Sequence, residues 1–363
     1  MAVNCGIVGL PNVGKSTLFN CLTKAGVEAK NFPFCTIEPN SGIIPVPDPR
    51  LVALEKLVKP LRTVPATIEF VDIAGLVAGA STGAGLGNQF LANIRETHAI
   101  VHVVRCFENK DIIHVNNKID PVADIETIET ELALADLQTV EKVLARNQRT
   151  AKAGDKDIVL LVNLLIKVQS WLDQGNQVRA MELTGTEKKL LADLHLLTAK
   201  PVLYLANIDD ANIHGNEFSM QVADYAKSNG AAFLALCNSI EEELTALNPE
   251  DQQLFLDDLD LAEPGLHQLI RNAYNLLGLK TFFTCGVKEV AAWTCRVDAK
   301  APQAAAAIHT DFEKGFIRAE VIGYDDFIAH KGEQGAKDAG KWRLEGKDYT
   351  TADGDIIHFR FNV

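Results

Sequence analysis

A glycine-framed loop near the start of the chain, GLPNVGKS at residues 9–16, restricts the possible folds more than any other stretch. It has the form G-x-x-x-x-G-K-[ST] and lies between an apolar run, VNCGIVG, and an amphipathic segment, TLFNCLTKA. A strand, loop and helix in this order form a P-loop, whose backbone N–H groups point inward as an anion site at a helix N-terminus. Lys15 is then expected to reach the β- and γ-phosphates of a nucleotide, and the Ser16 hydroxyl to bind Mg²⁺.

Further apolar runs follow the P-loop strand at intervals along the chain. They are TIEFVDIA from residue 67, AIVHVVRCF from 99, PVLYLANI from 201 and AAFLALCNS from 231. Nearly continuous apolar runs with helical segments between them are typical of parallel strands that are buried on both faces. The sequence therefore predicts the α/β fold class, as a P-loop NTPase G domain with a parallel-majority sheet.

Residues 120–200 interrupt this alternation, because they contain helical patterns and no convincing strand. Long amphipathic helices are predicted from residue 120 and from Lys156, and a third within residues 182–197 opens with a Thr-x-x-Lys cap. We expect an inserted α-helical, coiled-coil-like arm. After about Lys280 short alternating runs predict a small α+β module. The predicted domains are thus 1–119 with 201–278 for nucleotide binding, 120–200 for the arm and 279–363 for the terminal module.

Composition limits the compartment and the partners. No stretch approaches the roughly 18 uninterrupted apolar residues of a membrane span, and the N-terminus lacks a basic region before a cleavable apolar segment, so we expect a cytoplasmic protein without a membrane partner. Seven cysteines without a C-x-x-C pair suggest neither a disulfide framework nor a zinc site. A net charge of −13 argues against non-specific wrapping of nucleic acid, although a local basic face remains compatible with it. A monomer is expected.

Two further segments match the switch regions of nucleotide hydrolases. Asp72 and Gly75 frame a D-x-x-G motif at the end of the TIEFV strand, where Asp72 would hold Mg²⁺ through water and the Gly75 N–H would sense the γ-phosphate. D-x-x-G alone is common, so its position after a P-loop carries the argument. Thr36, in the loop NFPFCT, would complete the magnesium shell as a first switch. The glycine-dense residues 75–91 are expected to form a mobile second switch; the alternative is a structural turn.

The base-recognition motif leaves the choice of nucleotide open. Asn207, Ile208 and Asp210 occupy the place of the N-K-x-D motif of guanine-specific proteins, with Ile208 instead of lysine. Because adenine has an acceptor at N1 where guanine has a donor, a carboxylate facing that edge disfavours ATP unless it points elsewhere. A second stretch is placed to give backbone N–H contacts to the base or to form an ordinary strand-end turn; it consists of Cys237, Asn238 and Ser239.

GLPNVGKST, NFPFCTIEPNSG, DIAGLVAGASTGAGLGNQFL, RCFENKDIIH, the altered N-x-x-D and the terminal module together resemble the YchF / Obg-like ATPase family of translation-associated P-loop NTPases. The resemblance covers essentially the whole chain, and the terminal module is similar to a TGS domain, a ubiquitin-like β-grasp fold. It implies preference for ATP over GTP, association with the ribosome or ribosomal RNA, and base contacts near Asn207 and Ile208. The family carries N-x-x-E, and Asp210 departs from it. The implied nucleotide site is Asn12, Val13, Gly14, Lys15, Ser16 and Thr17, with Mg²⁺ at Ser16 and Thr36.

Hydrolysis requires a group that orients the attacking water. Ras-like enzymes use a Gln directly after D-x-x-G, and this chain has the apolar Leu76 there. The resemblance points to His114 for this role, whereas the residues alone favour a packed or surface histidine. Asn12 is a candidate for holding K⁺ beside the phosphates, which would make K⁺ a second cofactor. The predicted catalytic set is His114, Lys15 and Gly75.

We therefore predict a slow, Mg²⁺-dependent NTPase that acts as a conformational switch towards a ribosomal or RNA partner. One alternative is a GTP-specific switch GTPase. A second is a ribosome- or RNA-binding scaffold with vestigial hydrolysis. A metabolic phosphotransferase is disfavoured by the D-x-x-G and base motifs and by the lack of a visible acceptor site.

Overall fold

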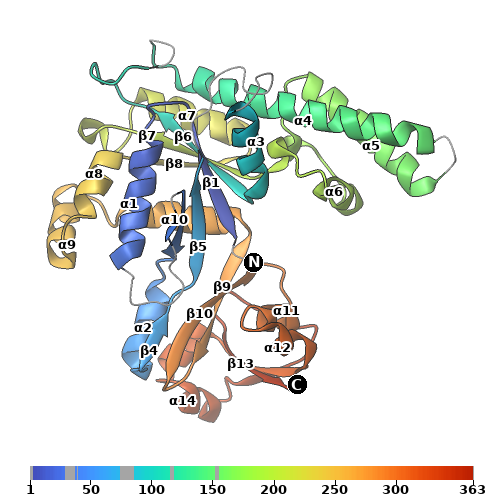
Figure 1. The fold of residues 1–363 in the computed structure, drawn as a ribbon. Coiled ribbons are helices and arrows are strands. Elements are labelled where there is room, and N and C mark those ends of the chain that lie inside the picture. Colours follow the sequence, from blue (N-terminus) through green and yellow to red (C-terminus); the bar gives the residue numbers. More distant parts are fainter. Residues whose placement is uncertain are drawn as a thin grey trace. The chain divides into compact units, whose positions relative to one another are not determined.

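A seven-stranded sheet carries the P-loop at the end of its central strand. The computed structural model describes residues 3–28, 37–38, 40–73, 86–114, 118–151 and 155–362. The strands form the order β2-β3-β5-β1-β6-β7-β8 (Figure 1). Five of them are parallel, as predicted: β1 (Asn4–Val8), β5 (Thr67–Asp72), β6 (Ala99–Arg105), β7 (Val202–Asn207) and β8 (Ala232–Leu236). The predicted fold class is confirmed.

The order of the strands explains where the site lies. β1 lies between β5 on one side and β6 on the other, so the strand order changes direction at β1. Ligands of open α/β sheets bind at such a topological switch point, beyond the carboxyl ends of the strands. An antiparallel edge pair, β2 (Ile37–Glu38) and β3 (Ser41–Pro45), was not predicted. The helices that accompany the sheet are α1 (Lys15–Glu28), α3 (Leu86–Glu96), α7 (Glu217–Ser228), α8 (Asn238–Leu244), α9 (Pro249–Asp258) and α10 (Gly265–Leu276).

The helical segment between β6 and β7 is built around two long helices, α4 (Pro121–Ala151) and α5 (Lys156–Asp173), which lie side by side (Figure 1). Their shared core includes Val140, Leu165 and Val168, all fully buried. A shorter helix follows, α6 (Gly185–Ala192), and it begins at a capping box. Thr184 and Glu187 exchange backbone and side-chain hydrogen bonds there, which corrects the predicted Thr-x-x-Lys cap.

A buried carboxylate holds α4 to the turn that leads back to the sheet. Asp136 is fully buried, and its oxygens accept hydrogen bonds from the backbone N–H groups of Leu197 and Thr198, both at 2.8 Å, and from the Thr198 hydroxyl at 2.7 Å. The turn is η2 (Leu197–Ala199). Three donors satisfy a charge that would otherwise be costly to bury. In the described residues, no helix combines the length and the apolar character that a membrane crossing requires.

The C-terminal residues form a second sheet with the order β12-β11-β13-β9-β10-β4. Its strands are β9 (Leu279–Cys285), β10 (Glu289–Arg296), β11 (Phe316–Ile322), β12 (Arg343–Glu345), β13 (Ile356–Phe361) and β4 (Arg62–Val64). Short helices accompany them: α2 (Pro49–Val58), α11 (Ala301–Ala306), α12 (Thr310–Lys314), α13 (Tyr324–Ala329) and α14 (Glu333–Asp338). The core between sheet and helices is rich in alanine and phenylalanine, including Ala304, Ala305 and Phe282.

The chain divides into two units of interleaved sequence. One unit consists of residues 1–25, 37–42 and 69–269, and the other of residues 26–36, 43–68 and 270–363. Residues 43–68 therefore group with the C-terminal residues and not with the P-loop, since β4 pairs in parallel with β10 and α2 packs on β9 and β10. The arm as a separate domain and the boundary at residue 279 remain predictions.

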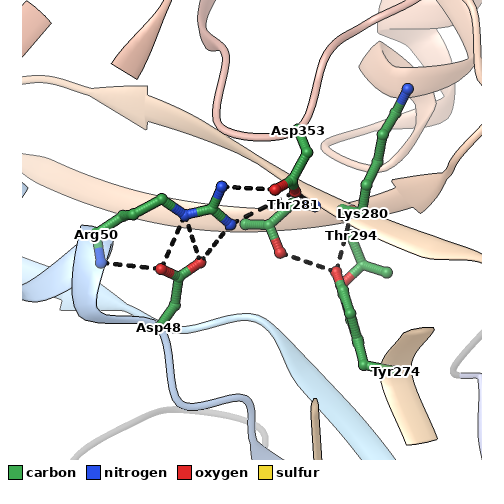
Figure 2. Close-up of polar contacts among 7 residues, drawn as sticks. All are labelled: Asp48, Arg50, Tyr274, Lys280, Thr281, Thr294 and Asp353. Carbon is green, nitrogen blue, oxygen red and sulfur yellow. Dashed lines mark hydrogen bonds and ion pairs between the residues drawn. The ribbon is translucent and has the colours of Figure 1, made fainter. Parts of the chain in front are cut away.

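An arginine fastens this early segment to the C-terminal strands within the second unit (Figure 2). The Arg50 guanidinium donates to Asp48 at 2.8 Å and to Asp353 at 2.6 Å, and Asp353 also accepts the backbone N–H of Thr281 at 2.9 Å. Nearby, the Tyr274 hydroxyl lies 3.0 Å from the Thr281 hydroxyl. One guanidinium thus joins the start of α2 to the turn before β13.

Candidate nucleotide site

The phosphate loop has a backbone that only glycine can supply at one position. Gly14 has φ of +102°, and a Cβ atom there would come within 2.4 Å of Asn207 Nδ2 and 2.5 Å of Asn238 Nδ2. Asn12 also lies in the left-handed region, at φ of 63°, which asparagine tolerates better than most residues. Helix α1 starts directly after the loop, at Lys15, so its first N–H groups face the loop.

Two asparagines hold this loop from the ends of neighbouring strands. Asn207, the last residue of β7, donates from Nδ2 to the Val13 carbonyl at 2.9 Å, and Asn238, just after β8, donates from Nδ2 to the Gly14 carbonyl at 2.9 Å. The Asn238 N–H in turn donates to Asn207 Oδ1 at 3.2 Å. The Asn207 carboxamide therefore binds the loop through its nitrogen and Asn238 through its oxygen, and its predicted base contact stays a prediction. The role of the Asn238 side chain was not predicted, because the motif assigned only backbone contacts to it.

Lys15 and Asp72 are charged groups in a site that is largely withdrawn from water. Lys15 is only 7% exposed and donates from Nζ to the Leu10 carbonyl at 2.7 Å. Burial lowers the pKa of Lys15 to about 8, although the Asp72 charge opposes that shift. Burial also raises the pKa of the Asp72 carboxyl, against the pull of Lys15. An anion beside Lys15 and a cation beside Asp72 would each stabilise the charged form of its neighbour.

The donors present fit a magnesium ion. Asp72 Oδ1 is buried and has no hydrogen-bond partner among the described residues, whereas Ser16 lies exposed in the first turn of α1. No group of three or more His, Cys, Asp or Glu side chains suited to a metal occurs in the described part of the chain. A carboxylate, a hydroxyl and the phosphates of the substrate are the set that Mg²⁺ uses, because Mg²⁺ is seldom held in a cage of protein ligands alone. The predicted Thr36 and Gly75, and Leu76, lie outside the described residues.

The residues predicted to meet the base lie around the end of β7 and the start of α8. Ile208 is 2% exposed, and its N–H donates to the Leu236 carbonyl at 3.0 Å. Asp210 is exposed, and its Oδ1 accepts the N–H of Ala211 at 2.9 Å. Cys237 is buried with its Sγ 3.0 Å from the hydroxyl of the exposed Ser239. The predicted Thr17 is half-buried in α1. The base contacts stay predictions.

His114 is a buried residue next to a contact with the phosphate loop. It is 6% exposed, and its Nε2 lies 2.8 Å from Oδ2 of Asp124, which is 3% exposed at the start of α4. The preceding residue, Ile113, accepts a hydrogen bond on its carbonyl from Asn12 Nδ2 at 3.1 Å. The structure therefore brings residue 114 to the P-loop through its neighbour, and a carboxylate orients the imidazole. The role of His114 in hydrolysis stays a prediction.

Comparison with known proteins gives matches along the whole chain. A family model described as 50S ribosome-binding GTPase matches residues 4–163, and the model YchF-GTPase_C, described as a protein of unknown function, matches residues 279–362. Proteins called "Ribosome-binding ATPase YchF" from Haemophilus ducreyi, Escherichia coli O157:H7 and Bacillus subtilis are 59%, 57% and 52% identical, with 100% of each chain covered.

Solved structures agree with these matches. The YchF GTPase of Schizosaccharomyces pombe superposes with a TM-score of 0.90 at 38% identity, covering 99% of this chain and 97% of that one. A GTP binding protein from Pyrococcus horikoshii shares the fold at a TM-score of 0.59 and 18% identity, over 99% of this chain and 100% of that one.

Proposed function

The chain belongs to the YchF family, and from this premise we propose that it is a slow, Mg²⁺-dependent ATPase that works on the ribosome as a conformational switch. The observation that carries the proposal is a P-loop whose buried Lys15 interacts electrostatically with Asp72, a carboxylate with one oxygen that no described group binds. The bacterial relatives that match from end to end are called ribosome-binding ATPases, which supports both the substrate and the partner.

Residues 12–17 bind the phosphates in this proposal. The backbone N–H groups of the loop and of the first turn of α1 face the phosphate oxygens. Lys15, which is 7% exposed, adds a positive charge beside them. Ser16, Asp72 and Thr36 would hold Mg²⁺. Bound Mg²⁺ would neutralise charge on the β- and γ-phosphate oxygens and so favour departure of the leaving group.

For hydrolysis we assign the water-orienting role to His114. Water oxygen forms a bond to the γ-phosphorus while the bond from that phosphorus to the β–γ bridging oxygen breaks, and the products are ADP, inorganic phosphate and a proton. The imidazole, held by Asp124, takes up the proton from the attacking water. Gly75, from its backbone N–H, would bind a γ-phosphate oxygen, and Asn12 would help to hold K⁺ beside the phosphates.

The position of Asp210 supports ATP as the substrate. Its carboxylate accepts the N–H of the next residue, Ala211, at the start of a short helical turn. A carboxylate in that local hydrogen bond does not face the base edge at which it would select guanine. Asn207 is likewise occupied by the loop. Without a carboxylate that binds the guanine edge, the site no longer discriminates against adenine.

Calorimetric competition between ATP and GTP, with Mg²⁺ present, tests the substrate. We expect tighter binding of ATP, and release of phosphate from ATP that stops when Mg²⁺ is chelated. Lys15→Ala serves as the inactive reference. Tighter binding of GTP would replace our assignment with a GTP-specific switch. Equal turnover in Na⁺ and K⁺ buffers would remove K⁺ from the cofactors.

Co-sedimentation with ribosomes separates a switch from a scaffold. We expect wild-type protein to sediment with ribosomes to a different extent with a non-hydrolysable ATP analogue and with ADP, and Lys15→Ala protein to lose that difference. If the bound fraction is the same in both nucleotide states and in the variant, the chain acts as a ribosome-binding scaffold whose hydrolysis is vestigial.

A further inference from the structure

The loop that follows β6 is organised around the side chain of Arg105. This side chain is 1% exposed and is the largest of the fully buried side chains in the described part of the chain. Its Nε donates to the Phe107 carbonyl at 3.2 Å, its Nη1 to the Ile112 carbonyl at 3.0 Å and its Nη2 to the Asn109 carbonyl at 3.0 Å. The guanidinium carbon also lies 4.7 Å from the centre of the Phe107 ring. Residues 107–112 are therefore wrapped around one cation.

This arrangement depends on the shape of the guanidinium. Arginine offers donors in a rigid planar fork, so three nitrogens reach three carbonyls spread along six residues. Lysine has one nitrogen on a flexible stem and cannot occupy all three positions. Asn109 and Ile112 are exposed, so water can bind the carbonyls that lose their donor, but water does not hold them in one place. With lysine at position 105 the loop therefore loses at least two of these three anchoring bonds.

The same loop joins the nucleotide site at both of its ends. At its start the Cys106 N–H donates to the Asn207 carbonyl at 2.8 Å, and Asn207 is one of the two residues that clamp the P-loop. At its end the Ile113 carbonyl accepts Nδ2 of Asn12 at 3.1 Å. His114 comes next, with its imidazole against Asp124. The path of the loop therefore decides where His114 lies relative to the P-loop.

We propose that Arg105 is a positioning residue for hydrolysis, which acts by shaping residues 107–113 so that His114 is held in register with the phosphate loop. The inference rests on the proposed function, because it presupposes that His114 orients water. Arg105 does not touch the nucleotide in this account. Its removal displaces the catalytic group and leaves the phosphate-binding backbone in place.

Arg105→Lys is the variant that tests this, with Arg179→Lys as its matched control. Arg179 is a largely buried arginine of the same unit, with its side chain 10% exposed, and it donates to the Tyr204 hydroxyl at 3.0 Å and pairs with Glu129. We expect Arg105→Lys to lower kcat for ATP about 10- to 100-fold, the range caused by a misplacement of about 1 Å. Affinity for a non-hydrolysable ATP analogue with Mg²⁺ should change less than about threefold, because residues 107–113 are not among the proposed phosphate-binding residues 12–17. Arg179→Lys should lower the melting temperature and leave kcat unchanged.

A double-mutant cycle with His114→Ala shows whether Arg105 acts through His114. If it does, Arg105→Lys causes no further loss in the His114→Ala background. An equal fold-loss in both backgrounds, or an unchanged kcat in the single variant, overturns the inference. Should Arg105→Lys fail to bind the analogue, Phe107→Leu takes its place in the cycle, because it removes only the ring contact. Wild-type protein that does not hydrolyse ATP would refute the proposed function instead, so the two failures are distinguishable.

Discussion

Burial of the single residue Lys15 lowers the pKa of its ammonium group and so links its protonation to the binding of an anion. Its ammonium donates to a backbone carbonyl but has little contact with water, and this burial disfavours the charged form. Nucleotide phosphates favour the charged form strongly. Binding therefore restores a proton to Lys15 whenever the pH lies above its pKa in the free protein, and the site gains selectivity for anions because only an anion compensates that proton.

This predicts a pH dependence of nucleotide binding. Since the pKa of Lys15 in the free protein is about 8, the group is charged at pH 7 and mostly neutral at pH 9, and binding at pH 9 must include proton uptake. Affinity for the ATP analogue with Mg²⁺ should fall about tenfold between pH 7 and pH 9, as linkage requires for one proton. Titration calorimetry in two buffers with different ionisation enthalpies measures both the affinity and the proton uptake.

Lys15→Arg is the control for that measurement, because an arginine stays protonated throughout this range. Its affinity should be nearly constant from pH 7 to pH 9, and titration of the nucleotide itself affects both proteins equally. Parallel pH profiles for the two proteins would show that Lys15 is not the titrating group.

Gly14 gives a second prediction, based on space and backbone conformation. In Gly14→Ala the new Cβ would press against the carboxamides of Asn207 and Asn238, and φ of +102° is unfavourable for alanine. We expect nucleotide binding to be lost and the free energy of unfolding to fall by at least about 1–3 kcal/mol, the cost of such backbone strain alone. Gly185→Ala is the matched control. No described atom lies within 4 Å of the place that a Cβ on Gly185 would take, and its φ is not positive, so chemical denaturation should show unchanged or slightly raised stability.

Among helices and strands, those with a long apolar pattern were predictable and those defined by distant partners were not. The five parallel strands and the helices α4 and α5 follow from apolar runs and helical spacing, because each buries a continuous face. β4 has only three residues, Arg62–Val64, and exists because β10 pairs with it. β2 and β12 are similarly short. Short edge strands carry too few residues for a period to show.

The site divides in the same way. Lys15, Ser16 and Asp72 stay candidates for binding phosphate and Mg²⁺, and as candidates they were predictable because a P-loop and D-x-x-G impose fixed spacings on such residues. The clamp by Asn238 and the wrapping of residues 107–112 around Arg105 were not, since both depend on which backbone carbonyls a side chain meets once the chain has folded. The stretch RCFENKDIIH contributed to the family resemblance, but its sequence does not indicate that the arginine side chain is buried.

The attachment of α2 can be tested at Arg50, which joins Asp48 to Asp353 (Figure 2). Arg50→Met removes both ion pairs and leaves two carboxylates close together. Because Asp353 is half exposed, water screens part of the loss, and we expect the free energy of unfolding to fall by about 1–2 kcal/mol. Urea denaturation followed by tryptophan fluorescence measures this. Arg296→Met breaks the exposed ion pair with Asp298 and should leave the free energy of unfolding unchanged. An equal loss of stability in both variants would mean that the Arg50 ion pairs contribute no more than an exposed pair does.

At the scale of the whole molecule, each of the two units consists of segments that lie far apart in the sequence. The chain is therefore not a simple succession of independent domains. Residues 43–68 lie between the two segments predicted as switches, yet they belong to the unit that residues 270–363 complete. In α2, Leu51 and Leu54 are buried, and the helix packs on β9, β10 and α13. The segment between the switches is therefore part of the C-terminal unit by its packing and part of the nucleotide domain by its position in sequence.

A chain that ends at residue 278 should consequently fail to fold as a nucleotide-binding domain. Without β9 and β10, α2 has no surface for Leu51 and Leu54, and β4 loses the strand that it pairs with. We expect insoluble protein, or soluble protein that does not bind the ATP analogue. Co-expression of residues 279–363 as a separate chain should restore both properties. A soluble, nucleotide-binding 1–278 fragment would show that the interleaving is not needed for folding.

The pairing of β4 with β10 joins residues more than two hundred positions apart. During synthesis, β4 and α2 leave the ribosome early, whereas their partners β9 and β10 are translated more than two hundred residues later. The nascent chain must therefore carry an uncovered apolar helix through most of its elongation, until β9 and β10 have been translated. This protein would be an informative substrate for studying which chaperones attend nascent chains with delayed partners.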